Sequence, residues 1–175
     1  VRIGAPRYDA AQGGYAEIFK SARAAYAEVA RMAADHGVRA VIETHMGLIA
    51  PTVARAMNIL DGLDPRHVGI MWDPGNQVTE GSEVYRMAVE TAGPYLAEVH
   101  VKNARWERAG DERGQVLWKT MGCPIQEGFI NWPAVLDVLK RAGYDGWLFF
   151  EDFSSDQPME ARVTANLKWF RTLLA

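Results

Sequence analysis

The chain has 175 residues, and its 19 Lys and Arg against 22 Asp and Glu give a formal net charge of −3. That balance argues against a nucleic-acid interface, which normally needs a basic face, and no apolar run approaches the roughly 20 residues of a membrane span. The lone cysteine, Cys123, excludes an internal disulfide and favours a reducing compartment. We therefore expect a cytoplasmic protein of one domain, residues 1–175, with neither a nucleic-acid nor a membrane partner.

Short apolar segments alternate with amphipathic segments along the chain. In chain order the pattern predicts a strand over 1–6, a helix over 15–33, a strand over 38–45, a helix over 51–60, a strand over 67–73, a helix over 82–93, a strand over 95–102, a helix over 132–143, a strand over 146–152 and a helix over 158–174. Gly37 is placed to cap the first helix, Pro51 suits the first turn of the second, and Ser82 suits the N-cap of the third. Residues 103–128 have no sustained period and predict a long irregular connection.

Five alternations of strand and helix with short links are typical of βαβ units and a parallel sheet. Two architectures are compatible with this pattern. A doubly wound open sheet would be complete at this length, whereas a (β/α)8 TIM barrel usually needs about 250 residues, so the chain would hold only its last five β/α units. No glycine-rich phosphate-binding fingerprint follows any strand, which removes the usual support for the open sheet.

Four polar residues lie at the carboxyl ends of consecutive predicted strands: Glu43, Asp73, His100 and Glu151. A single acid at a strand end is most often a helix cap or a solvated residue, but four such positions in a row indicate a site. Carboxylates with one imidazole suit a divalent cation. We expect Mn²⁺ first, with Mg²⁺, Co²⁺ and Zn²⁺ as alternatives. A structural zinc site would need cysteines that this chain lacks.

The distances between strands favour the barrel. Neighbouring strands lie about 4.8 Å apart, so four adjacent strand ends in an open sheet spread over roughly 14 Å. The ligands of one ion must approach it within about 2.0–2.6 Å. Because a curved wall directs its inward side chains toward one axis, a barrel brings the four residues together more easily than a flat sheet does.

Further candidates share strand faces with these four residues. His45 lies two residues after Glu43 and Lys102 two residues after His100, so each is a substrate-contact candidate. A packed histidine and a solvated lysine are the alternatives. Arg105 belongs to a group of planar side chains in 103–128, with Trp106 and Trp118 among them, that could either cover a sugar ring or form a subunit interface.

The segments VIETHMG, WDPGN, EVHVKNA, EGFINWPAVLDVLKRAGYDG and LFFED resemble the sugar phosphate isomerase/epimerase proteins of the xylose-isomerase-like TIM-barrel superfamily, and the resemblance covers nearly the whole chain. It implies that Glu43, Asp73, His100 and Glu151 bind a divalent cation. In the ketose 3-epimerase branch the two glutamates also exchange the substrate proton from opposite faces, which implies catalytic roles for Glu43 and Glu151. That branch has a second His three residues after the Asp, where this chain has Asn76 as a substrate-binding candidate.

The expected function is a metal-dependent sugar or sugar-phosphate isomerase or epimerase that acts on a sugar or polyol through an enediolate intermediate. The alternatives are an inositol-type dehydratase or hydroxyacid isomerase on the same scaffold, and a truncated, inactive sugar-binding or assembly module. A metal phosphodiesterase that acts on abasic DNA is disfavoured, because the chain has only four histidines and a net charge of −3. In a barrel, the first and last strands would have open edges, so we expect a homo-oligomer or a longer chain that completes the barrel.

Overall fold

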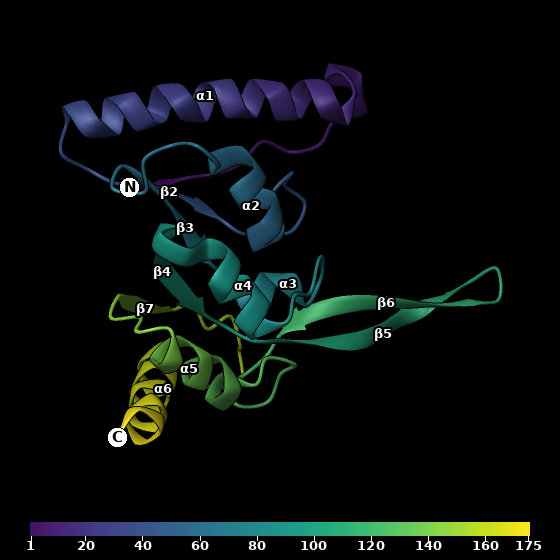
Figure 1. Ribbon diagram of the computed structural model, residues 1–175. Helices are drawn as coiled ribbons and strands as arrows, with labels where there is room; N and C mark the ends of the chain where they lie inside the picture. The colour runs from purple at the N-terminus through teal and green to yellow at the C-terminus, as the bar shows by residue number, and fades with distance from the viewer.

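The computed structural model describes residues 1–175, and a five-stranded parallel sheet of order β1-β2-β3-β4-β7 lies at its centre. The strands are β1 (Arg2–Ile3), β2 (Ala40–Glu43), β3 (Val68–Trp72), β4 (Leu96–Val101) and β7 (Trp147–Phe150). The main helices are α1 (Tyr15–Asp35), α2 (Val53–Leu60), α4 (Tyr85–Ala92), α5 (Trp132–Arg141) and α6 (Met159–Leu174). They cover one face of the sheet in chain order (Figure 1). No helix combines the length and the apolar composition that crossing a membrane requires.

The core lies between the sheet and these helices. Ile42, Ile70 and Val99 are fully buried and belong to one apolar cluster with residues of all five helices. Because side chains alternate along a strand, the residues next to them point to the opposite face of the sheet. Glu43 and His100 therefore lie on the face that the helices leave uncovered.

The prediction of an irregular connection over residues 103–128 is wrong. The segment forms an antiparallel hairpin of β5 (Ala104–Glu112) and β6 (Gln115–Gly122) that projects from the rest of the molecule (Figure 1). Arg113 and Gly114 both have positive φ at its turn, as a tight two-residue hairpin turn requires. Both faces of the hairpin are largely exposed, so its sequence shows no alternation of apolar and polar residues.

The predicted N-cap at Ser82 is also wrong. Helix α4 begins at Tyr85, with Val84 as an N-cap that makes no side-chain hydrogen bond. The neighbouring carboxylate instead serves another helix: Glu83 accepts hydrogen bonds from the backbone N–H groups of Val53 at 2.8 Å and Ala54 at 3.1 Å, at the start of α2. A carboxylate at this end also interacts favourably with the helix dipole.

Replacing Glu83 by Ala should lower the free energy of unfolding by about 1–2 kcal/mol, because two backbone donors at the start of α2 lose their acceptor. Urea denaturation followed by circular dichroism measures this. Replacing Glu90 by Ala is the matched control, since it removes only an exposed ion pair with Arg86, and should leave the unfolding free energy nearly unchanged. Equal effects of the two substitutions would contradict the capping role.

Candidate metal centre

The structure brings the four predicted residues together at the carboxyl edge of the sheet. Glu43 ends β2, Asp73 follows β3, His100 lies in β4 and Glu151 follows β7. One ligand atom from each lies within 4.8 Å of all the others. Two ligands on opposite sides of an ion, at bond lengths of about 2.0–2.4 Å, are themselves about 4–4.8 Å apart. The spacing therefore suits a single ion.

The imidazole of His100 lies among the three carboxylates. Its Nδ1 atom is 3.2 Å from Glu43 Oε1, 3.6 Å from Glu151 Oε2 and 3.7 Å from Asp73 Oδ2, yet it is buried without a hydrogen-bond partner. Burial favours the neutral ring, but the carboxylates outweigh it and raise the pKa of His100 to about 11. An unpartnered nitrogen in so negative a surrounding fits a divalent cation, and the donor set of oxygens with one imidazole agrees with this.

Two further cationic side chains contact the carboxylates. Lys102 Nζ lies 2.8 Å from Asp73 Oδ2 and 2.7 Å from Glu151 Oε2, and Arg2 Nη1 lies 3.0 Å from Glu43 Oε2. The neighbouring His100 and Lys102 lower the pKa of Glu151 to about 2. Burial opposes ionisation of Glu43, but His100, Arg2 and Lys102 together lower its pKa. Both glutamates are therefore ionised at neutral pH.

A network of hydrogen bonds fixes Asp73. The residue is the N-cap of the short helix α3 (Pro74–Gln77), which was not predicted. Its Oδ1 accepts from the backbone N–H of Asn76 at 3.0 Å and its Oδ2 from Asn76 Nδ2 at 2.9 Å, while its own N–H donates to Thr44 Oγ1. Asn76 Nδ2 also donates to the Thr44 carbonyl. The amide orientation is thereby fixed, and Asn76 Oδ1 is left without a partner.

A cavity of about 470 Å³ lies over this cluster. Three of the four predicted substrate contacts, His45, Asn76 and Lys102, line it together with Glu43, Glu151, the base of the hairpin and Phe153. Arg2 also lines the cavity. Arg105 does not, because its guanidinium pairs with Glu107 at 2.9 Å and Glu107 lies outside the cavity lining as well.

Comparison with known proteins agrees with this architecture. Residues 3–173 match the model of the xylose isomerase-like TIM barrel family. The chain belongs to this family. A D-tagatose 3-epimerase-like protein of known structure superposes with a TM-score of 0.75 at 23% identity, over 99% of this chain and 61% of that chain. A xylose isomerase-like TIM barrel protein from Mycobacterium smegmatis, solved in complex with magnesium, superposes with a TM-score of 0.67 at 19% identity. The superposition covers 96% of this chain and 52% of that chain.

A curated relative, inosose dehydratase from Geobacillus thermodenitrificans, is 25% identical over 126 residues, which are 69% of this chain and 42% of the relative. The chain thus spans less than half of the length of that dehydratase. The predicted fold, part of a (β/α)8 barrel, and the predicted family are both confirmed. The five parallel strands form one curved portion of the barrel wall, with the four candidate ligands at its carboxyl edge, where TIM-barrel enzymes have their active sites.

Asn103 was not predicted from the sequence, although it organises the loops around the cavity of this barrel segment. Its buried amide uses both ends: Nδ2 donates to the carbonyls of Ile125 at 2.7 Å and Ile130 at 3.0 Å, and Oδ1 accepts from the N–H groups of Ala104 and Ile130. Gly128 packs so closely that a Cβ there would lie 2.1 Å from Asn103 Oδ1. The base of the hairpin and the segment before α5 are thus attached to the end of β4.

Replacing Asn103 by Ala should lower the free energy of unfolding by about 2 kcal/mol or more, because the buried backbone groups at Ile125, Ile130 and Ala104 lose their partners. Denaturant unfolding measures the loss, and hydrogen exchange should rise within 104–130 more than in α1. Asn58→Ala on the exposed surface of α2 is the control. A loss no larger than that of the control would contradict the role of Asn103.

Proposed function

We propose that this chain carries the metal-binding part of a divalent-metal-dependent sugar or sugar-phosphate isomerase or epimerase. The observation that carries the proposal is that four ligand atoms from four neighbouring strands lie within 4.8 Å of one another, beneath a cavity of about 470 Å³. The reaction would move a proton on a carbon next to a carbonyl, through an enediolate. A sugar or polyol derivative with a carbonyl beside a hydroxyl is the matching substrate class.

Glu43, Asp73, His100 and Glu151 would hold one divalent cation. Mn²⁺ is our first assignment, with Mg²⁺, Co²⁺ or Zn²⁺ as alternatives, since oxygen ligands with one imidazole suit all of these ions. When bound, such an ion polarises a carbonyl and stabilises negative charge on its oxygen. The likeness to the M. smegmatis protein, which was solved in complex with magnesium, supports this class of ion.

Glu43 and Glu151 are the proposed proton-transfer residues. Glu43 ends β2 and Glu151 follows β7, and these strands are separated in the sheet by β3 and β4, so a substrate between the two residues would have one carboxylate on each side. Their lowered pKa values keep both carboxylates ionised, so either one is free to accept a proton. Return of the proton to the neighbouring carbon on the same face gives isomerisation. Epimerisation requires that the second glutamate first take up a proton from solvent, which it then donates to the opposite face of the same carbon.

The other cavity side chains are proposed to orient the substrate. Asn76 Oδ1 has no partner in the protein and can accept a hydrogen bond from a hydroxyl group, while Lys102 and His45 can meet oxygens of the substrate. Arg105 pairs with Glu107 outside the cavity, so it would contact only a substrate long enough to extend over the hairpin.

A dehydratase is the second candidate, and the 25% identity to inosose dehydratase favours it. A hydroxyacid isomerase is a further alternative on the same scaffold. All of these reactions begin when a carboxylate removes a proton next to a carbonyl, but in a dehydratase the electrons then expel a hydroxyl group.

Incubation with Mn²⁺ and a panel of ketoses and inososes separates the candidates by product: an epimer, an isomer or an unsaturated ketone. Cation binding without turnover of any substrate would instead support a sugar-binding or assembly module.

Replacing Glu151 by Gln should lower kcat by at least about 10³-fold, since it removes a proton-transfer group and one ligand. The assay is product formation with saturating Mn²⁺, and calorimetry should report weaker Mn²⁺ binding in the same variant. Glu127→Gln, at an exposed position outside the cavity lining, is the matched control and should retain the activity. Full turnover by the Glu151 variant would refute the assigned role.

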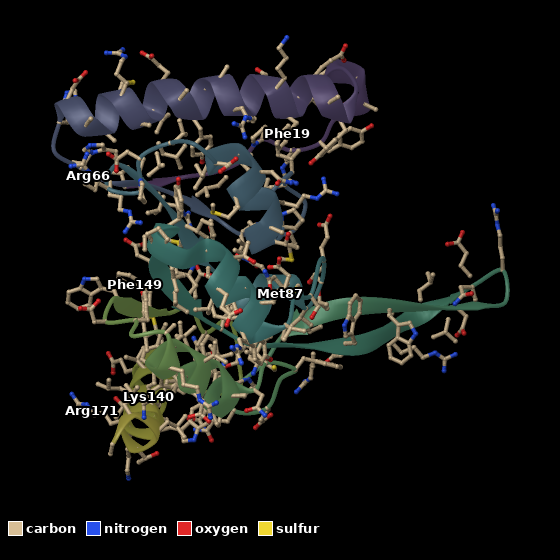
Figure 2. The ribbon with its side chains drawn as sticks, viewed as in Figure 1. Phe19, Arg66, Met87, Lys140, Phe149 and Arg171 are labelled. Carbon is tan, nitrogen blue, oxygen red and sulfur yellow. The ribbon has the colours of Figure 1, made fainter.

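We further propose that the hairpin joins two copies of this chain. Its side chains extend into open space on both faces (Figure 2), and Trp118 is 59% exposed. An isolated two-stranded hairpin is marginally stable in water, and tryptophan and arginine are typical interface residues. Its charges are nearly balanced, which lets two hairpins meet without net repulsion: Arg105, Glu107, Arg108, Asp111, Glu112, Arg113 and Lys119.

Replacing Trp118 by Glu should convert a dimer into a monomer, because a carboxylate would be buried without a partner at the centre of the interface. Light scattering coupled to size-exclusion chromatography measures the molar mass. Trp147→Glu on the edge strand β7, where Trp147 is also exposed, is the control and should remain dimeric. A monomeric wild-type protein, or dissociation by the β7 variant alone, would contradict this interface.

A further inference from the structure

The ammonium group of Lys102 occupies the oxygens that a cation at the candidate metal centre would use. Its Nζ lies 2.8 Å from Asp73 Oδ2 and 2.7 Å from Glu151 Oε2. The same two oxygens face His100: Asp73 Oδ2 lies 3.7 Å and Glu151 Oε2 lies 3.6 Å from His100 Nδ1. Lys102 is therefore bound within the ligand cluster and not merely beside it.

The protein is built to hold this lysine in place. Lys102 is 8% exposed, and its aliphatic chain crosses the backbone of Gly75 so closely that a Cβ at Gly75 would lie 2.4 Å from Lys102 Cγ. On the cavity side, its ammonium group lies 5.4 Å from the centre of the Phe153 ring, within the range of a cation–π contact. A freely moving surface lysine would need neither the glycine nor the aromatic ring.

We propose that Lys102 is an internal substitute for the metal, which neutralises Asp73 and Glu151 in the cation-free protein and competes with the divalent cation for them. This inference rests on the metal site of the proposed function and adds a role for a residue outside the ligand set. Asp73 is buried and Glu151 is half-buried, and without a counter-ion their two carboxylates would repel each other. The lysine removes that repulsion before a cation arrives, and the site keeps its assembled geometry.

Competition between Lys102 and a divalent cation for Asp73 and Glu151 would change where the lysine side chain lies. If Asp73 and Glu151 held a dication, the ammonium group of Lys102 would lose its place on these carboxylates, and repulsion between like charges would move it away from the ion. The cavity is the open space beside it, since Lys102 and Phe153 both line that cavity. Cation binding would thus present a positively charged hydrogen-bond donor to the substrate. Charge and position make it suited to an oxygen that carries or develops negative charge.

The test compares wild-type protein with Lys102→Met and Lys102→Gln, with Lys20→Met on the exposed surface of α1 as the matched control. Calorimetric titration with MnCl₂ gives the Kd, and thermal unfolding in EDTA gives the stability of the cation-free protein. The proposal predicts opposite effects in the Lys102 variants: Mn²⁺ should bind at least about tenfold more tightly, and the cation-free Tm should fall. The glutamine variant, whose amide can donate to the carboxylates, should lose less Tm than the methionine variant.

The outcomes separate this inference from the proposed function. If wild-type protein binds Mn²⁺ and the Lys102 variants bind it equally or more weakly, Lys102 does not compete and the inference fails, while the metal site stands. A cation-free Tm unchanged by both substitutions would overturn the role as counter-ion. If neither wild type nor variants bind any divalent cation, the proposed metal site is itself wrong and the competition fails with it.

Discussion

Mutual repulsion among three carboxylates at one sheet edge is the constraint on which the rest of this site depends. Glu43 and Asp73 are buried, and Glu151 is half-buried. Such a group cannot stay ionised unless cationic groups offset it. The chain supplies three: the ring of His100, whose pKa is raised to about 11, and the side chains of Lys102 and Arg2. The three positive side chains therefore nearly balance the three carboxylates before any metal ion binds. A dication that enters the cluster must displace the ammonium group of Lys102 from Asp73 and Glu151.

The geometry of the cluster is fixed by backbone attachments and not by the charges alone. Asp73 receives two hydrogen bonds from Asn76 and donates one to Thr44, so its carboxylate has a single orientation. Asn103 attaches the hairpin and the loop before α5 to the end of β4. Sites that bind ions or stabilise developing charge work best when their groups need not reorganise. The side chains in these hydrogen bonds lie within a few residues after the ends of β2, β3 and β4: Thr44, Asp73, Asn76 and Asn103.

The sequence was sufficient to predict the five parallel strands, the five main helices and the four converging residues. The central strands β2, β3 and β4 contain buried β-branched residues that mark them in the sequence, and parallel strands end at the same edge of the sheet. The hairpin could not be predicted by periodicity, because water reaches both of its faces. The cap at the start of α2 was missed for another reason: Glu83 is 30 residues away from Val53 in the chain, and no local pattern reports such a contact. The pairing of Arg2 with Glu43 and the packing of Lys102 on Gly75 also join residues that are far apart in the chain.

The measurement that tests the account most directly is an anomalous-difference map from crystals grown with MnCl₂, with data collected on either side of the manganese absorption edge. We expect one manganese peak bounded by Glu43, Asp73, His100 and Glu151, with the ammonium group of Lys102 displaced from Asp73 and Glu151. Well-ordered crystals with no peak at this position, and with Lys102 still bound to both carboxylates at saturating manganese, would contradict it.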